Sequence, residues 1–473
     1  MYKNAKSHIS VKNVLSESFP CQVGVRQGEN LSPLLFAIFL NDFKSFLSEN
    51  YNGLTKVSDS ILNELNIYLK IFCLLYADDT LILAESASQL QKALKSLNAY
   101  CNRWSLKVNL DKTKVIIFSK GKIRKHKSFA FGDHPIDVVE DYVYLGTTFN
   151  YNGKFNKAKA KQVFQAKKAT FSILTKVRQS NLSVGVFIDL FEKLTIPILL
   201  YGSEIWGYEN TKQVQVMCNN VMRKFLKLHK STSMCMLIGE LGLKQIDEYI
   251  DNRMLNFWCN IATGDESKIS TILYKWAKSL YDQNIFKSVW LDKIKATLGS
   301  IGMSNCFDNI TNMNNNWFKN TIKLKINDSY NQIWSAYVFN NSTCLNYRAM
   351  TERKFLQDYL LKLPSQYMYA MCKFKCANHR MPIVSGRHNG IPVDDRKCNL
   401  CDLNDHYNKI GDEFHYLFNC PFFREDRVRY LKRYFYTSPN MYKMTQLFNY
   451  VNKKTMLKLA KFICIILNKF KNG

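Results

Sequence analysis

The chain has 473 residues, enough for roughly three domains that each bury a core. It carries 66 basic and 38 acidic residues, a formal net charge of +28, and 14% of its residues are aromatic. This basic excess predicts a polyanionic partner, most simply a nucleic acid whose bases stack on the rings. A general bias toward lysine and asparagine is the alternative explanation of the charge.

Neither a membrane span nor a signal peptide is predicted. Residues 1–6 are polar, and no apolar run reaches the ~18–20 residues that a transmembrane helix needs. The 14 cysteines are irregularly spaced except near the C-terminus, which indicates reduced thiols rather than a disulfide framework. We therefore expect an intracellular protein, in the nucleus, the cytoplasm or both, with no membrane partner.

The first predicted elements are a helix and a hairpin. Ser32 as N-cap and Pro33 at the first helical position predict the start of the helix. Its expected apolar face consists of Leu34, Leu35, Ile38, Phe39 and Phe43. Two apolar runs, 71–75 and 81–84, then flank the sequence Tyr-Ala-Asp-Asp at 76–79, which predicts two short strands joined by an acidic turn.

A second helix and several strands complete an α+β domain over residues 1–150. A capping-box pattern, Ser86 to Gln89, predicts the start of the helix. The residues expected on its buried side are Leu90, Leu94, Leu97, Cys101 and Trp104. Strand-like segments follow at 106–108, 115–118, 129–131 and 142–149, the last of them before the turn Asn152-Gly153.

Beyond Lys154 the composition shifts to helix formers with many lysines. We expect helical regions over 151–230 and 231–350, with the Asn-rich stretch 312–316 as a surface loop. A C-terminal module is expected over 351–473. Within it, Cys372 and Cys376 lie one helical turn apart, and we interpret them as buried core thiols.

Asp78 and Asp79 are the residues of the hairpin that carry chemistry. Two adjacent carboxylates are costly to bury without a compensating charge, and a hard divalent cation is the usual partner of paired Asp oxygens. A metal ion at a hairpin tip, in a basic protein, indicates phosphoryl transfer on nucleic acid.

A second constellation has the spacing of a metal centre. Its members are Cys398, Cys401, His415 and Cys420, and three thiolates with one imidazole suit a closed tetrahedral zinc site. His406 is a rival ligand, but a retroviral-type knuckle would then need a cysteine where Gly411 stands. We therefore prefer His415 and Cys420, and expect the three sulfurs and the ring nitrogen to converge within about 4 Å.

These motifs resemble those of a known family. The Tyr-Ala-Asp-Asp turn follows Gly-Val-Arg-Gln-Gly-Glu-Asn-Leu-Ser-Pro-Leu-Leu-Phe at 24–36, and the pair resembles the palm of non-LTR (LINE-type) retrotransposon reverse transcriptases. Three further blocks are similar in order: a Lys-Thr segment at 106–114, a primer-grip turn at 144–146 and the segment 196–206. Residues 413–421 resemble the C-terminal Cys-Cys-His-Cys module of the same elements.

The resemblance implies a partial polymerase palm, a helical thumb and linker, and a zinc module that binds RNA and DNA as template and primer. It also implies an RNA-directed DNA polymerase that works by two-metal phosphoryl transfer. Asp78 and Asp79 would hold Mg²⁺, and Lys112 would act as general acid or clamp at the pyrophosphate, unless it is an ordinary solvated lysine. The residues implied at the nucleotide and template are Arg26, Gln27, Gly28 and Tyr76.

One departure from the family pattern affects catalysis. Such polymerases need a further metal-binding Asp before the Gln-Gly segment, yet the only acidic residue among 1–26 is Glu17. We therefore expect an N-terminally truncated palm that binds Mg²⁺ weakly or not at all. The alternative to an inactive polymerase fragment is a non-catalytic nucleic-acid-binding relic of a retroelement.

The polypeptide 1–473, expressed as such, is expected to extend no primer on an RNA template with Mg²⁺ and deoxynucleotides, because one of the required carboxylates is absent from it. A gel-based primer-extension assay measures this. Extension that disappears in Asp78→Ala would contradict the expectation.

Overall fold

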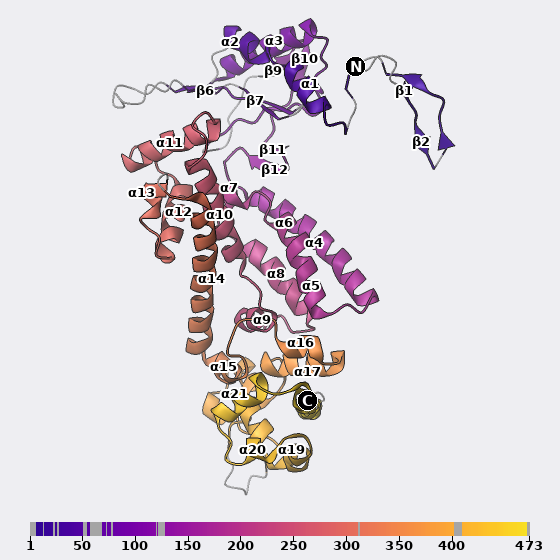
Figure 1. Ribbon diagram of the computed structural model, residues 1–473, viewed down its shortest axis with the longest axis vertical. Coiled ribbons are helices and arrows are strands. Elements are labelled where there is room, and N and C mark those ends of the chain that lie inside the picture. Colours follow the sequence, from indigo (N-terminus) through magenta and orange to yellow (C-terminus); the bar gives the residue numbers. More distant parts are fainter. Residues whose placement is uncertain are drawn as a thin grey trace. The chain divides into compact units, whose positions relative to one another are not determined.

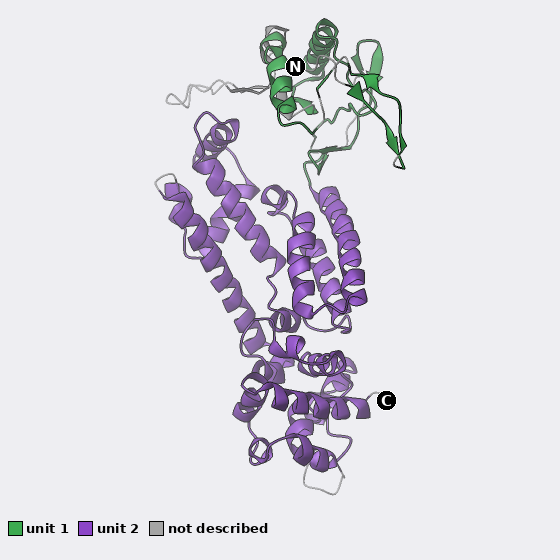
Figure 2. Cartoon of the chain, turned by 45° about the vertical axis from the view of Figure 1, so that its right-hand side comes forward, with its two compact units in different colours: residues 1–154 green, residues 155–473 purple. Residues whose placement is uncertain are grey.

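The computed structural model describes residues 6–470, apart from 13, 22–23, 26–27, 51–53, 57–68, 72, 77–78, 120, 122–127, 311–312 and 402–408. The chain forms two compact units, Met1–Lys154 and Phe155–Gly473 (Figure 2). Among the described residues, no helix is both long and apolar enough to span a membrane.

Unit 1 combines three helices with short antiparallel strand pairs, as the α+β prediction requires. The helices are α1 (Ser32–Phe39), α2 (Phe43–Asn50) and α3 (Ala87–Arg103). The paired strands are β1 (Lys6–Ser7) with β4 (Phe19–Pro20), β2 (Ser10–Val11) with β3 (Val14–Leu15), β5 (Leu54–Lys56) with β6 (Leu69–Ile71), β7 (Cys73–Tyr76) with β8 (Asp79–Ile82), β9 (Phe129–Phe131) with β10 (His134–Ile136), and β11 (Asp141–Tyr144) with β12 (Thr147–Asn150).

Helix α1 differs in detail from its prediction. Leu31 rather than Ser32 is the N-cap, and Ser32 is a buried helical residue. The helix ends at Phe39, so that Phe43 belongs to α2, where it is buried. Leu34 and Ile38, on the expected apolar face, are 56% and 62% exposed. None of the described elements covers these two side chains.

Helix α3 starts where it was predicted, with Ser86 as N-cap, although the Gln89 side chain bonds the amide of Glu85 and not that of Ser86 as a capping box requires. The Ser86 side chain accepts from the Gln89 amide at 3.3 Å, and the Gln89 side chain accepts from the Glu85 amide at 3.1 Å. One face packs on α2 through Tyr100, while Leu94 and Cys101 join the core beneath β9 and β10. Trp104, predicted to be buried, follows the last helical turn and is 37% exposed.

Two strand predictions were wrong and one needs correction. Segment 106–108 is irregular, and 115–118 forms only an isolated parallel bridge between Val115 and Val138, because its described pairing with 137–139 does not extend beyond Val115. Segment 142–149 is a hairpin instead of one strand. Leu145 and Gly146 both have positive φ, as the tight two-residue turn between β11 and β12 requires.

Unit 2 is almost entirely helical (Figure 1). Its first part contains α4 (Asn156–Gln179), α5 (Val184–Leu190), the π-helix η1 (Phe191–Thr195), α6 (Ile196–Leu199), α7 (Ser203–Trp206), α8 (Lys212–Phe225), α9 (Met234–Leu241), α10 (Ile246–Ala262), α11 (Ile269–Asp282), α12 (Val289–Ser300), α13 (Cys306–Asn309) and α14 (Asn315–Asn340). Its second part contains η3 (Ser342–Cys344), α15 (Leu345–Met350), α16 (Asp358–Lys362), α17 (Ser365–Lys375), α18 (Pro382–His388), η4 (Val393–Asp395), η5 (His415–Asn419), η6 (Pro421–Phe423), α19 (Arg424–Tyr430), α20 (Arg433–Tyr436), α21 (Met441–Asn449) and α22 (Lys453–Lys469).

Helices α10 and α14 pack along each other in the middle of unit 2 (Figure 1). Asn314 caps α14 by accepting from the Trp317 amide at 3.0 Å, so Asn315 and Asn316 are helical and not part of the predicted loop. Gly207 allows α7 to approach α10 closely, because a Cβ there would lie 2.3 Å from the Ile250 Cγ2 atom.

A buried charge joins α9 to the C-terminal part of unit 2. Glu240 is fully buried and accepts from Thr351 at 2.7 Å and from the Tyr359 hydroxyl at 2.5 Å. The Lys375 ammonium group, 1% exposed, lies 3.1 Å from the same carboxylate. On the same helix, α17, Cys372 is buried, and so is Cys376 directly after its last residue, as predicted.

Candidate functional site

The acidic turn lies on the β7–β8 hairpin of unit 1, where the sequence predicted it. The strands pair antiparallel with Tyr76 opposite Asp79 and Leu75 opposite Thr80. Asp79 is the first residue of β8 and is exposed to solvent. Asp78, the preferred metal ligand, lies outside the described residues, so the geometry of the carboxylate pair stays a prediction.

Of the implied nucleotide and template residues, Arg26 and Gln27 also lie outside the described part of the chain. Gly28 has a φ of +85°, a conformation that residues with a Cβ rarely adopt, and, apart from its chain neighbours, no atom of the described residues lies within 4 Å of where its Cβ would be. The backbone at Gly28 is therefore open to close approach by a ligand. Tyr76 contributes its backbone to the hairpin.

Lys112 lies in a loop that side chains hold in place. The Asn109 carboxamide accepts from the Lys112 amide at 3.2 Å, and the Tyr142 hydroxyl donates to the Lys112 carbonyl at 2.9 Å. Tyr142 belongs to β11, three residues before Leu145 of the turn Leu145-Gly146. The structure thereby connects the Lys-Thr segment to the hairpin predicted as primer grip, while the Lys112 side chain itself is exposed.

The four predicted metal ligands come together in unit 2. The ligand atoms of Cys398, Cys401, His415 and Cys420 all lie within 4.8 Å of one another. The Cys420 sulfur is 4.0 Å from that of Cys398 and 3.9 Å from that of Cys401, whose sulfur is 3.3 Å from His415 Nε2. A tetrahedral zinc ion with three sulfurs and one nitrogen would give edges of about 3.8 Å and 3.6 Å. The cluster is thus of the size that holds one metal ion.

Local backbone structure creates this convergence. The Leu400 amide donates to the Cys398 sulfur at 3.4 Å, and Lys397 pairs with Ile410 in an antiparallel bridge. The π-helix η5 then carries His415, and the Cys420 amide donates to the His415 carbonyl at 2.8 Å. Gly411 is required beside the site, because a Cβ there would lie 3.1 Å from Cys398 Cα and 2.8 Å from the Tyr416 hydroxyl.

The electrostatics of the cluster favour a thiolate. A hydrogen bond from Cys420 lowers the pKa of the Cys398 thiol to about 3. His415 is buried, and its Nδ1 atom has no hydrogen-bond partner among the described residues, while Nε2 faces the sulfurs. Asp412 accepts from the His415 amide at 2.8 Å and so holds the start of this segment.

Arg427 is a supporting residue that the sequence did not reveal. Its buried guanidinium group donates from Nε to the Leu417 carbonyl at 2.9 Å and from Nη2 to the Cys420 carbonyl at 2.8 Å. Burial lowers its pKa, whereas the nearby Cys420 raises it. An arginine seven residues after the last ligand has no sequence signature, since the contact depends on how α19 packs against η5.

Several residues near the Cys and His cluster are buried and contribute to the packing of the protein core. His379 is 2% exposed and lies 2.9 Å from Glu413, which also accepts from Asn346 at 2.6 Å. Burial raises the pKa of Glu413, but the contacts with His379 and Asn346 and a backbone hydrogen bond together lower it below its ordinary value. Phe423 is buried, whereas Phe422 is exposed under the Lys469 ammonium group at 4.6 Å. His406 lies outside the described residues.

A family comparison agrees with the sequence and the fold of unit 1. Residues 2–149 match the family described as reverse transcriptase (RNA-dependent DNA polymerase). This segment includes the β7–β8 hairpin, Lys112 and the β11–β12 hairpin. Residues 2–149 are therefore similar to reverse transcriptases.

The similar proteins that have been described come from mobile genetic elements. The chain is 26% identical over 208 residues to the RNA-directed DNA polymerase from mobile element jockey of Drosophila melanogaster, covering 42% of this chain and 21% of that protein. It is 27% identical over 249 residues to a probable RNA-directed DNA polymerase from transposon BS of the same organism, covering 51% and 26%.

A third relative is the retrovirus-related Pol polyprotein from type-1 retrotransposable element R2 of Nasonia vitripennis, 28% identical over 162 residues and covering 32% of this chain and 15% of that protein. This chain thus spans about a quarter or less of the length of these three relatives. The predicted resemblance to LINE-type reverse transcriptases is confirmed.

Replacing Arg427 by Gln should destabilise the η5 segment by roughly 2–4 kcal/mol, because two buried carbonyls lose charge-assisted donors. Hydrogen–deuterium exchange of amides 415–423 measures the effect as faster exchange. Arg429→Gln is the matched control, since Arg429 is exposed on the same helix. Equal exchange in the two variants would show that Arg427 does not hold the segment.

Proposed function

We propose that this chain functions in RNA-directed DNA synthesis by a LINE-type retroelement, with RNA and DNA as template and primer. The observation that carries the proposal is the reverse transcriptase match over residues 2–149, which contains the Tyr-Ala-Asp-Asp hairpin. The formal charge of +28 supports a polyanionic partner.

Asp78 and Asp79 are the proposed Mg²⁺ ligands, since carboxylates are the donors that this cation prefers and Asp79 is exposed at the hairpin. A bound ion there would supply charge neutralisation for the triphosphate and the primer hydroxyl. In this proposal the nucleotide approaches the backbone at Gly28, and Lys112, whose side chain is exposed, contributes positive charge near the phosphates.

The C-terminal cluster is proposed as a zinc centre with Cys398, Cys401, His415 and Cys420 as ligands. The donor set supports zinc over magnesium or calcium, because thiolates and imidazole are its preferred ligands. Three thiolates and a neutral imidazole around Zn²⁺ carry one net negative charge. The buried Arg427 beside Cys420 offsets that charge, which is the role expected of an outer-shell partner.

A second candidate function is nucleic-acid binding without polymerisation. For the polypeptide 1–473 expressed as such, residues 1–26 favour it, because they contain no Asp and their only acidic side chain is Glu17. Both candidates require template–primer binding, and primer extension separates them.

Binding of an RNA–DNA template–primer should weaken steeply with salt, with a log–log slope of about −3 or steeper. Lys168, Lys176 and Arg178 are exposed on α4, and replacing all three by Ala should make the slope shallower. Lys193→Ala is the control, because Lys193 already pairs with Asp189 at 2.7 Å. Fluorescence anisotropy between low and moderate salt gives both slopes. A flat salt dependence would contradict nucleic-acid binding.

One zinc ion per chain is expected by elemental analysis of the purified protein. Cys420→Ser and His415→Ala should each lower the zinc content and destabilise the C-terminal module, because structural zinc contributes directly to folding. His406→Ala should retain the metal. Zinc lost from His406→Ala but kept in His415→Ala would reverse the ligand assignment.

A further inference from the structure

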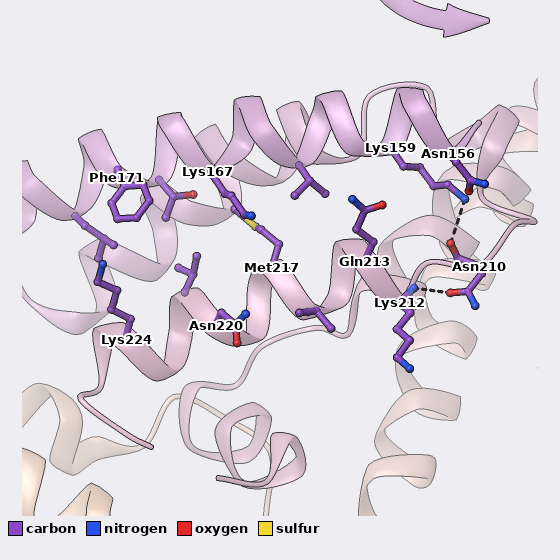
Figure 3. A pocket seen from close by; sticks show the side chains of 15 residues that line it. Asn156, Lys159, Lys167, Phe171, Asn210, Lys212, Gln213, Met217, Asn220 and Lys224 are labelled. Carbon is purple, nitrogen blue, oxygen red and sulfur yellow. Dashed lines mark hydrogen bonds between the residues drawn. The ribbon is translucent and has the colours of Figure 1, made fainter. Parts of the chain in front are cut away.

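A groove lies between the long helix α4 and helix α8, with a volume of about 670 Å³ (Figure 3). Its floor is apolar. The apolar residues that line it are Val163, Phe171, Leu174, Val216, Met217 and Val221. Phe171 and Val216 are 54% and 44% exposed, so part of this floor faces solvent. None of the residues that line the groove belongs to the acidic turn or to the Cys and His cluster.

The edges of the groove are positively charged. Lys167, Lys212 and Lys224 line it, and the fourth lysine, Lys159, is buried against Glu209 at 2.6 Å. Among the described residues, none of the first three forms an ion pair, and the Lys224 ammonium group lies over the Phe171 ring at 4.6 Å. Helices α4 and α8 contain seven and three basic residues and no acidic one. The charge of the groove is therefore left for a partner to neutralise.

The shape suits a helix. The stretch of α8 that lines the groove, Lys212 to Lys224, is about 18 Å long at 1.5 Å per residue, the length of a helix of about 12 residues. An amphipathic helix binds such a site by laying apolar side chains at i, i+3, i+4 and i+7 along the floor. Carboxylates on its flanks would then reach the lysines at the edges.

We infer that the α4–α8 groove binds an acidic amphipathic helix of a partner protein, a function additional to nucleic-acid binding. The apolar floor decides between these two partners. Aliphatic side chains gain burial against Val163, Val216 and Met217, whereas phosphates gain nothing from such a floor, and bases find one ring, Phe171, among the residues that line it. The exposed lysines of α4 outside the groove, such as Lys168, remain free for nucleic acid.

The test uses a stapled, fluorescein-labelled helical peptide of about 14 residues, with Leu at i, i+3, i+4 and i+7 and Glu on both flanks, titrated with the full chain. Lys167→Glu combined with Lys224→Glu should weaken binding by about tenfold or more. Lys168→Glu combined with Lys176→Glu reverses as many charges outside the groove and should change it by less than about twofold. Val216→Asp, at an exposed position, should also weaken binding, and circular dichroism checks that each variant is folded.

The opposite results are equally specific. Equal weakening by the two double variants would mean that the peptide senses only net charge. Binding of a control peptide with Lys in place of Glu at the same strength would exclude the charge complementarity. Displacement of the peptide by a single-stranded oligonucleotide that itself loses affinity in Lys167→Glu/Lys224→Glu would assign the groove to nucleic acid.

Discussion

Three cysteine sulfurs and an imidazole nitrogen within 4.8 Å of one another form the interaction on which the C-terminal part of the chain depends. Thiolates at such distances repel each other unless a positive charge lies between them, so the arrangement suits the metal centre proposed for these four side chains. Its ligands come from two segments, 398–401 and 415–420. A metal ion would hold segments 398–401 and 415–420 together, because a small module has few other interactions that fix their positions.

A buried ion pair, Glu240 with Lys375, connects the C-terminal part of the chain to the rest of unit 2. Glu240 on α9 and Lys375 on α17 are almost inaccessible to solvent, and Thr351 and Tyr359 complete the hydrogen bonds of the carboxylate. Removing one partner of such a pair leaves an uncompensated charge, which costs about 3–5 kcal/mol. The helical middle of the chain and the region that leads into the metal cluster are therefore coupled by a contact that tolerates few substitutions.

Local patterns predicted the fold best where the chemistry is itself local. The Ser86 N-cap and the turn between Tyr76 and Asp79 each depend on a few neighbouring residues. The Cys and His spacing was equally informative, because few other arrangements explain paired thiols. Burial was harder to predict. Leu34 and Trp104 have apolar side chains at helical spacing, but whether another element covers them depends on tertiary packing, and 115–118 lacks the neighbouring strand that its sequence pattern would suit.

Contacts made at a distance account for the remaining differences. Arg427 and the Glu240–Lys375 pair support their surroundings through packing of helices that are separated in sequence, and no spacing rule identifies them. The groove between α4 and α8 likewise depends on how two helices pack. The sequence of each helix shows only that it is basic and amphipathic. The function assigned to unit 1 rests on motifs, whereas the partner proposed for unit 2 rests on structure.

Zinc K-edge X-ray absorption on the full chain, loaded with one equivalent of Zn²⁺, tests the metal-centred account most directly. The account predicts three sulfur ligands at about 2.3 Å and one nitrogen at about 2.0–2.1 Å. A first shell made only of nitrogen and oxygen, or with a single sulfur, would contradict it, because the four converging side chains would then not be what holds the ion.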